Sequence, residues 1–233
     1  MVLAVIPARY DSVRLPGKAL VDIGGRPMVV RVWERARAAV GEAVIATDDD
    51  RIEAACRAWG APVIRTGRCE SGTDRVAEAV AGRAGLSVVV NVQGDEPLVE
   101  PETVAAVAAG VTDATPIATG AAPLADPADP ARVKVVTSDA GDALYFSRLP
   151  IPEGGPWLLH VGVYAFRPAT LQALRALPPS PLERSERLEQ LRWLAAGHRV
   201  RVVPVAAPHP SVDTPADLER VRALWSSPLR GAQ

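Results

Sequence analysis

Residues 91–97 combine the side chains and the position along the chain that a metal ion needs. They read Asn-Val-Gln-Gly-Asp-Glu-Pro and end an apolar run, residues 87–92, that is typical of a buried strand in an α/β sheet. Asp95 therefore falls at the carboxyl edge of the predicted sheet, which is where such folds bind ligands. Its carboxylate suits a hard cation such as Mg²⁺, and Gly94 allows the backbone to approach closely. The residues alone explain Asp95 equally well as a turn residue that caps a helix.

Residues 8–18, which follow the first apolar run, contain the charges that a polyphosphate attracts. Three cations, Arg9, Arg14 and Lys18, leave the strand end together with the hydroxyl of Ser12 and a glycine. Such a cluster is suited to binding phosphate oxygens. A solvated basic loop is the alternative that these residues leave open.

Two familiar phosphate-binding loops do not fit this segment. A Walker A loop that ends at Gly17-Lys18 needs Gly at position 12 and Ser or Thr at position 19, where the chain has Ser12 and Ala19. The Gly-x-Gly-x-x-Gly pattern of dinucleotide-binding folds is absent from this turn as well. What remains is a clamp of Arg9 and Lys18 around a triphosphate whose departing charge must be neutralised.

Two further segments, each at a predicted helix start, carry residues that could bind the nucleotide or a metal ion. Residues 71–75, Ser-Gly-Thr-Asp-Arg, contain three helix-capping residue types, while Gly72 and the backbone N–H groups allow a flat base to approach closely. Asp213 precedes a helix that begins with Pro215, so helix capping is again the alternative to metal binding. As metal ligands from distant parts of the chain, Asp95 and Asp213 would share one Mg²⁺ or two with triphosphate oxygens.

The elements that must position these residues alternate between strand and helix patterns. This alternation predicts an α/β fold with a doubly wound, mostly parallel sheet. The strand patterns cover residues 3–7, 43–47, 62–65, 87–92, 116–119, 133–137, 143–147, 159–166 and 199–205. The helix patterns begin with one at Pro27 and continue with residues 51–59, 74–84, 102–109, 168–176, 182–196 and 215–225.

Two segments in the second half depart from the alternation. Residues 138–142, between two strand patterns, predict a hairpin, which is an antiparallel insertion in the sheet. Residues 121–130 are rich in Ala, Asp and Pro, and we interpret them as an exposed connection.

Composition excludes several classes of protein. The chain has 233 residues and 48% hydrophobic residues, enough for one full core, and its net charge of −1 argues against a nucleic-acid partner. It has no apolar run of membrane-spanning length and no leader before the first strand, so we expect a cytoplasmic protein without a membrane partner. Cys56 and Cys69 lie outside any Cys-x-x-Cys spacing and are interpreted as small apolar residues or surface thiols.

Short blocks of sequence, in order along nearly the whole chain, resemble the 3-deoxy-manno-octulosonate (KDO) cytidylyltransferase family, the CMP-KDO synthetases. The blocks are residues 5–10, 14–18, 46–49, 71–75, 91–97, 133–136, 144–148, 188–192 and 212–215. The resemblance implies a nucleotide-diphospho-sugar transferase fold, a homodimer, and the reaction of CTP with KDO to give CMP-KDO and pyrophosphate for lipopolysaccharide synthesis. It implies one domain over residues 1–233, with CTP binding mainly in 1–120 and a sugar-binding, dimer-forming insertion in 131–166.

The resemblance also assigns roles to individual residues. The catalytic set would be Arg9, Lys18, Asp95 and Asp213, the last two as Mg²⁺ ligands. The CTP-binding set would be Ala8, Arg9, Ser12, Lys18, Ser71, Gly72, Arg75 and Asp95. The KDO-binding set would be Gln93, His160, Tyr164, Glu189 and Gln190. Without the resemblance, His160 and Tyr164 suit an ordinary half-buried strand face, and Glu189 and Gln190 suit a solvated helix.

The expected mechanism is in-line attack of the sugar's anomeric hydroxyl on the α-phosphorus of CTP, without a covalent enzyme intermediate. Two departures from the family bear on the sugar. Residues 151–157 are a shorter flap than the family usually has, and Ser211 precedes Val212 where the family tends to have Gly. The alternatives are therefore a cytidylyltransferase for an amino-KDO analogue or a sialic acid, or a non-catalytic nucleotide- or sugar-binding protein.

Overall fold

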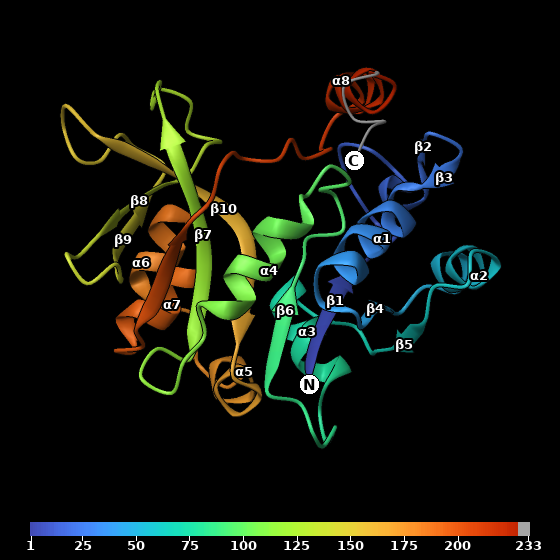
Figure 1. Cartoon of the computed structure of the whole chain (residues 1–233), viewed down its shortest axis with the longest axis horizontal. Coiled ribbons are helices and arrows are strands. Elements are labelled where there is room, and N and C mark those ends of the chain that lie inside the picture. The colour runs from blue at the N-terminus through green and yellow to red at the C-terminus, as the bar shows by residue number, and fades with distance from the viewer. Residues whose placement is uncertain (228–233) are drawn as a thin grey trace. The chain divides into compact units, whose positions relative to one another are not determined.

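Strands and helices alternate along the chain as the sequence predicts, and the central sheet is mostly parallel with antiparallel strands within it (Figure 1). The computed structural model describes residues 1–227. Contacts within the chain divide it into two units. Unit one contains Met1–Leu86, Asn91–Val104 and the segment from His209, and unit two contains Ser87–Val90 and Ala105–Pro208.

Unit one is built on the parallel strands β1 (Val2–Pro7), β4 (Ala43–Thr47) and β5 (Val63–Arg65). All of β4 and the middle of β1 are buried, which explains their unbroken apolar sequence. The helices are α1 (Met28–Val40), α2 (Asp50–Ala58), α3 (Gly72–Ala79) and α8 (Pro215–Trp225). Helix α4 (Pro101–Ala109) begins in unit one and ends in unit two.

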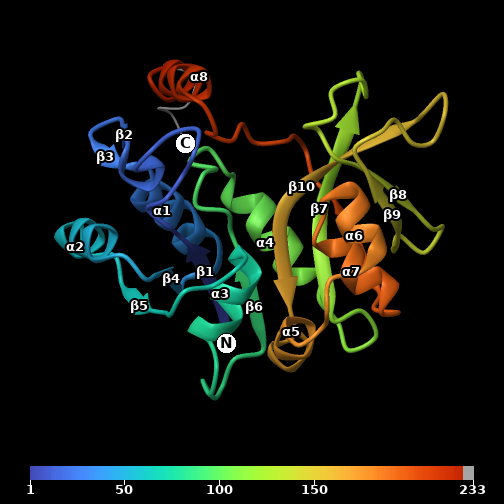
Figure 2. The same cartoon turned by 180° about the vertical axis from the view of Figure 1, so that it is seen from behind.

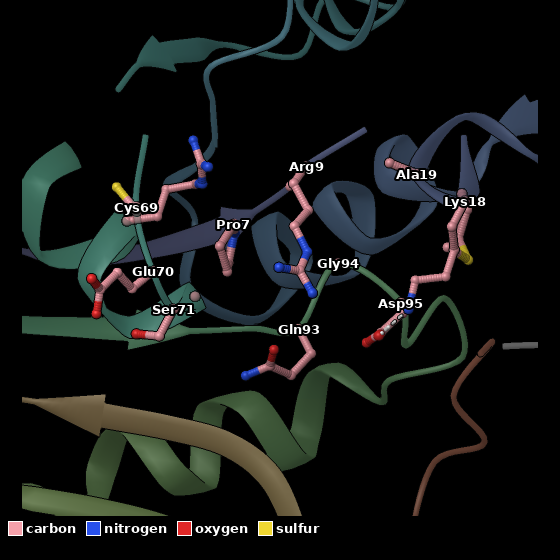
Figure 3. Close-up of a pocket in the computed structure, with 14 residues that line it drawn as sticks. Pro7, Arg9, Lys18, Ala19, Cys69, Glu70, Ser71, Gln93, Gly94 and Asp95 are labelled. Carbon is pink, nitrogen blue, oxygen red and sulfur yellow. Dashed lines mark hydrogen bonds and ion pairs between the residues drawn. The ribbon is translucent and has the colours of Figure 1, made fainter. Parts of the chain in front are cut away.

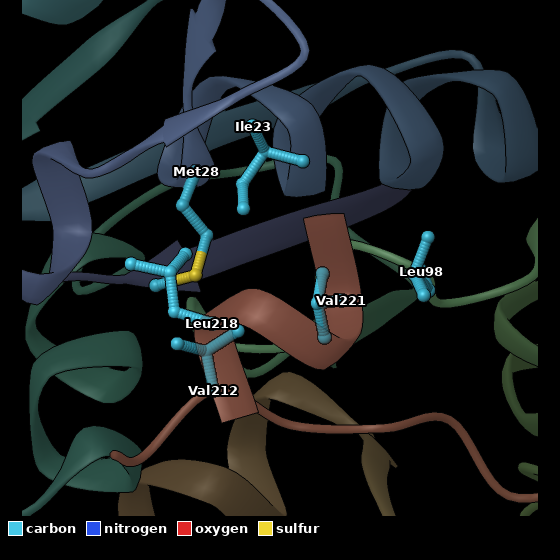
Figure 4. Packing of buried hydrophobic residues seen from close by; sticks show 6 residues of the cluster. All are labelled: Ile23, Met28, Leu98, Val212, Leu218 and Val221. Carbon is cyan, nitrogen blue, oxygen red and sulfur yellow. The ribbon is translucent and has the colours of Figure 1, made fainter. Parts of the chain in front are cut away.

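A small apolar cluster in unit one fixes the segments that carry the two candidate metal ligands (Figure 4). The short elements before α1 are the 3₁₀ helix η1 (Lys18–Leu20) and the strands β2 (Asp22–Ile23) and β3 (Arg26–Pro27), a pair that the sequence patterns do not predict. The cluster's buried members are Ile23, Met28, Leu98, Val212, Leu218 and Val221. Since Leu98 follows Asp95 and Val212 precedes Asp213, burial of these side chains anchors both carboxylates.

Unit two is mainly antiparallel. Its strands are β6 (Val88–Asn91), β7 (Ile117–Leu124), β8 (Lys134–Thr137), β9 (Ala143–Ser147), β10 (Trp157–Phe166) and β11 (Val200–Pro204). Strand β10 pairs antiparallel with β7 and β8, while β11 is parallel to β7. The hairpin predicted at residues 138–142 is confirmed, because β8 and β9 pair antiparallel around it.

Helices α5 (Pro168–Arg175), α6 (Pro181–Glu186) and α7 (Gln190–Ala195) complete unit two. In Figure 2, α6 and α7 lie beside β8 and β9. The prediction of one helix over residues 182–196 is wrong, because Arg187 adopts the left-handed conformation with φ 56° and separates α6 from α7.

The interpretation of residues 121–130 as an exposed connection is wrong at its beginning. Strand β7 continues to Leu124, and Ala121, Ala122 and Leu124 are buried. Alanine has low strand propensity, but pairing on both sides by β10 and β11 overrides it here. Among residues 1–227, no helix has the length and apolar character needed to cross a membrane.

Candidate active site

A cavity of about 220 Å³ lies in unit one, where β1 ends beside the loop after Asn91 (Figure 3). Residues from five separate stretches of the chain line it. They are Pro7, Ala8, Arg9, Lys18, Ala19, Met28, Cys69, Glu70, Ser71, Gly72, Arg75, Gln93, Gly94 and Asp95. The cavity thus gathers most of the residues that the sequence assigns to CTP.

Lys18 joins the two candidate metal ligands. Its Nζ donates to Asp95 Oδ2 at 2.7 Å and to Asp213 Oδ1 at 3.0 Å, and Figure 3 shows its side chain directed at Asp95. Burial acts to lower the pKa of Lys18, but the charges of the two carboxylates outweigh it, so the pKa is raised. Two carboxylates from distant parts of the chain therefore converge on one cationic position.

Backbone contacts hold Asp95 and Asp213 together. The Val212 N–H donates to the Asp95 carbonyl oxygen at 2.9 Å, next to the carboxylate of Asp213. The cap of α8 is Thr214, whose side chain accepts from the Asp217 N–H, and α4 begins six residues beyond Asp95. The helix-capping explanation is therefore wrong for both Asp95 and Asp213.

The segment before Asp213, where the chain departs from the family that it resembles, is held by a hydrogen bond of its own. His209 Nε2 lies 3.1 Å from the hydroxyl of Thr103 in α4, and Thr103 is buried. This hydrogen bond and the burial of Val212 fix the segment at both ends.

Two glycines of the site are required by their surroundings. A Cβ on Gly94 would lie 2.8 Å from the carbonyl oxygen of Pro7, closer than side chains tolerate. Gly17, just before Lys18, has φ 67°, and a Cβ there would meet the Tyr10 hydroxyl at 3.3 Å. Close backbone approach at Gly94 is as the sequence predicts.

The 71–75 segment both caps a helix and lines the cavity. Ser71 is the N-cap of α3 and forms a capping box with Asp74. Arg75 is buried, donates to the Thr66 hydroxyl at 2.5 Å and lies 3.2 Å from an Asp48 oxygen. The capping interpretation thus holds for Ser71, and it leaves Gly72 and Arg75 facing the cavity.

The other residues of the first loop occupy different positions. Arg9 is exposed and points into the cavity in Figure 3, while Ala8 is buried at its wall. Ser12 does not line this cavity but an adjoining hollow of about 360 Å³, which it shares with Arg9. The sequence assignment of CTP residues overlooked Arg14, whose Nη2 lies 3.0 Å from Asp213 Oδ1, although its place in the basic loop was a signal.

Four of the five sugar-side residues gather in unit two. The rings of His160 and Tyr164 in β10 lie 5.2 Å apart, and the Tyr164 ring meets Trp193 of α7 edge-on at 5.1 Å. Two extra residues in β10 between Val161 and Tyr164 keep His160 and Tyr164 on one face. Glu189 and Gln190 begin α7, and their place at a helix start follows from the break at Arg187.

Burial governs the ionisation of this group. It lowers the pKa of His160 to about 4, so the imidazole is neutral at pH 7. It raises the pKa of Tyr164 well above its usual value, and the charge of Glu189 adds to this effect. The Tyr164 hydroxyl is buried without a hydrogen-bond partner among the described residues. Gln93, the fifth residue, lines the cavity of unit one.

Two residues near these sites escaped the sequence analysis. Glu96 is buried beside Asp95, and burial together with the Asp95 charge raises its pKa to about 8. Thr119 of β7 is fully buried, with its hydroxyl 2.9 Å from His160 Nε2. No sequence signal marks Thr119, because its contact with His160 depends on the pairing of β7 with β10.

Comparison with known proteins identifies the family. Residues 3–200 match the family described as Cytidylyltransferase. The chain is 51% identical to the 3-deoxy-manno-octulosonate cytidylyltransferase of Anaeromyxobacter sp. (strain Fw109-5), over 97% of each chain. The Escherichia coli protein of the same name is 48% identical, over 97% of this chain and 96% of its own. This chain belongs to the 3-deoxy-manno-octulosonate cytidylyltransferase family.

A solved structure of the family agrees closely with the fold. The structure of CMP:2-keto-3-deoxy-manno-octonic acid synthetase complexed with CTP superposes with a TM-score of 0.91 and 46% identity, covering 96% of this chain and 97% of that one. The sequence-based prediction of the family is confirmed. Members of the 3-deoxy-manno-octulosonate cytidylyltransferase family are nucleotidyltransferases, and enzymes that use CTP in this way typically need a divalent metal ion.

The donor atoms of the site fit such a metal. Asp95 and Asp213 supply hard carboxylate oxygens that already converge on one cation, the Lys18 ammonium. Within residues 1–227, no group of three or more His, Cys, Asp or Glu side chains is arranged to hold a metal. A hard divalent ion held by two carboxylates with substrate oxygens matches this arrangement.

Proposed function

We propose that this protein transfers a cytidylyl group from CTP to 3-deoxy-D-manno-octulosonate, giving CMP-KDO and pyrophosphate for lipopolysaccharide synthesis. The observation that carries the proposal is the convergence of Lys18, Asp95 and Asp213 at a cavity that the 71–75 segment also lines. The match over nearly the whole length of named KDO cytidylyltransferases supports the same conclusion.

In this proposal each residue of unit one has a role toward CTP. Arg9 and Lys18 bind the triphosphate and balance the charge of departing pyrophosphate, with Ala8 and Ser12 in the same loop. Ser71, Gly72 and Arg75 face the cytosine. Asp95 and Asp213 hold Mg²⁺, which when bound supplies positive charge to the α-phosphoryl oxygens and the attacking hydroxyl.

The chemical step is a single in-line displacement. The anomeric hydroxyl oxygen forms a bond to the α-phosphorus as the bond to the β-phosphate oxygen breaks and pyrophosphate leaves; the hydroxyl proton passes to solvent. The residues that orient the sugar are Gln93, His160, Tyr164, Glu189 and Gln190. Their polar atoms match a polyhydroxy acid, which needs several directed hydrogen bonds.

The broader assignments follow from the same family membership. We propose that residues 1–233 act as one nucleotidyltransferase domain, with CTP mainly on 1–120 and with 131–166 contributing to the sugar site and to a homodimer. We also propose that the protein acts in the cytoplasm, where CTP is available. Light scattering at several protein concentrations tests the homodimer.

The decisive experiment measures pyrophosphate release from CTP with a panel of acid sugars, with and without Mg²⁺. The proposal predicts release with KDO that depends on Mg²⁺. The shorter 151–157 segment makes an amino-KDO analogue or a sialic acid the alternative substrate. If one of these sugars has a higher kcat/KM than KDO, that sugar is the substrate in place of KDO. If no sugar causes pyrophosphate release, the enzyme assignment fails and a non-catalytic nucleotide- or sugar-binding protein is the remaining explanation.

A further inference from the structure

Thr119 lies at the centre of the candidate sugar site in unit two. Its hydroxyl is fully buried and has three close neighbours from β10. The His160 Nε2 atom and the Val163 carbonyl oxygen are each 2.9 Å away, and the Val161 carbonyl oxygen is 3.2 Å away. The irregularity in β10 between Val161 and Tyr164 directs both carbonyl groups at this one hydroxyl.

A count of protons decides which group donates. A threonine hydroxyl has one hydrogen, and a carbonyl oxygen only accepts, so the hydrogen of Thr119 is directed at Val163 and Val161. Toward His160 the hydroxyl can then only accept, and Nε2 must carry a hydrogen. The Tyr164 hydroxyl forms no hydrogen bond with a described residue, so it does not compete for the Thr119 hydrogen.

The protonation state of Nε2 determines that of the other ring nitrogen of His160, Nδ1. His160 is neutral at pH 7 because burial holds its pKa at about 4, so a hydrogen on Nε2 leaves Nδ1 with a free lone pair. The ring is held in place from two sides, by the edge-on ring of Phe146 at 5.1 Å and by Tyr164 at 5.2 Å. The imidazole is therefore a fixed, uncharged hydrogen-bond acceptor.

We propose that Thr119 is a positioning residue that fixes the His160 tautomer, so that His160 Nδ1 accepts a hydrogen bond from one hydroxyl of the acid sugar. This inference rests on the proposed function. It implies that His160 selects for a hydroxyl and does not pair with the sugar's carboxylate, since a neutral acceptor offers a carboxylate neither charge nor hydrogen.

Nitrogen NMR tests the tautomer in the full-length protein without substrate. The chain has three histidines, so the His160 ring signals are assigned as those lost in His160→Ala. We expect a protonated Nε2 and an unprotonated Nδ1 in the native protein, a mixture of tautomers in Thr119→Val, and the native pattern in Thr119→Ser. A protonated Nδ1 in the native protein, or an unchanged pattern in Thr119→Val, would overturn the inference.

Substrate kinetics test the role of the acceptor. Thr119→Val should raise the KM for the sugar about tenfold while leaving the KM for CTP unchanged, and Thr119→Ser should restore it. Thr115→Val is the matched control, because Thr115 is a buried threonine of unit two whose hydroxyl pairs with Thr112 instead. Equal effects of Thr119→Val and Thr115→Val on the sugar KM would contradict a positioning role.

Sugar analogues that each lack one hydroxyl complete the test. One analogue should lose about tenfold in kcat/KM with the native enzyme but little with Thr119→Val, because both changes remove the same hydrogen bond. If, for every analogue, the loss in kcat/KM caused by the missing hydroxyl and the loss caused by Thr119→Val multiply, the two changes act independently and the proposed contact is excluded. If the native enzyme turns over no acid sugar, the proposed function fails and the sugar contact with it, whereas the NMR result on the tautomer is independent.

Discussion

At the scale of single residues, the site depends on two carboxylates that share one cation. Asp95 and Asp213 both contact Lys18, and the Val212 N–H ties their backbones together. Like-charged groups so close are stable only with a cation between them. The arrangement is therefore suited to a divalent ion that the substrate brings with its phosphates.

Replacing Asp95 by Asn should lower turnover by roughly a hundredfold or more, because an amide is a much weaker ligand for a hard cation than a carboxylate. Steady-state pyrophosphate release at several Mg²⁺ concentrations measures the effect. Asp139→Asn serves as the control, since Asp139 is exposed in the hairpin of unit two. Near-normal turnover of the Asp95 variant at saturating Mg²⁺ would exclude the metal-ligand role.

At the scale of elements, the sequence predicted the loop positions of Asp95 and Lys18, each after a clear strand, and the place of Arg75 at the start of a clear helix. The local sequence patterns did not predict how the elements pair with one another. Thr119 pairs with Tyr164, and the contact of its hydroxyl with His160 depends on the irregularity in β10, which no local pattern marks. The break at Arg187 was missed for a similar reason, since the helical spacing continues on both sides of it.

The segment that carries Asp213 illustrates how one element positions another. His209→Ala should raise the Mg²⁺ concentration for half-maximal activity severalfold, because loss of the bond to Thr103, worth about 1 kcal/mol, frees the segment that holds Asp213. Amide exchange in residues 209–213 should accelerate in the same variant. His198→Ala, between α7 and β11, is the control. An unchanged metal requirement together with unchanged exchange would show that His209 plays no part in the site.

An ion pair between Glu183 of α6 and Arg192 of α7 stabilises the fold in a way that depends on pH. Arg192 Nε and Nη2 donate to the two carboxylate oxygens of Glu183 at 2.7 and 2.6 Å, and this contact lowers the pKa of Glu183. A lowered pKa stabilises the fold above the unfolded value of about 4.3, and the contribution disappears as the pH falls through the folded value.

Glu183→Gln should therefore reduce the free energy of unfolding at pH 7, on the order of 1 kcal/mol for a partly exposed pair. The difference in the free energy of unfolding between the variant and the native protein should shrink in acid, because the native carboxylate is then protonated and uncharged, as Gln is. Urea unfolding at several pH values measures it. Glu219→Gln, which removes an exposed pair with Arg222, should cost less. A difference that stays constant with pH would mean that the charge of Glu183 is not what stabilises the pair.

At the scale of the whole molecule, the residues assigned to the two substrates fall in different units. Every residue assigned to CTP or to the metal belongs to unit one, and the sugar residues other than Gln93 belong to unit two. The sequence predicted both sets through the family resemblance. The resemblance divided the chain linearly, with CTP mainly on 1–120 and a sugar-binding insertion in 131–166. Unit one is instead assembled from three separate stretches of chain, including the one that brings Asp213, and no local pattern predicts such an assembly.

This division predicts separate footprints for the two substrates in hydrogen exchange. CTP with Mg²⁺ should slow exchange in residues 8–20 and 69–76 of unit one. The acid sugar alone should slow it in residues 157–166 and 188–195 of unit two. A ligand stabilises the groups that it orders, by about 2.7 kcal/mol at a hundred times its Kd, so local slowing of up to about a hundredfold is expected.

Mass spectrometry of peptides from the full-length protein resolves these four segments. Asp95→Asn provides the internal control, because it should reduce the CTP footprint in unit one and leave the sugar footprint unchanged. Equal slowing of both units by CTP alone would mean that the nucleotide orders the sugar residues before the sugar arrives. In that case His160 and Tyr164 would be coupled to CTP binding, and the assignment of one substrate to each unit would be wrong.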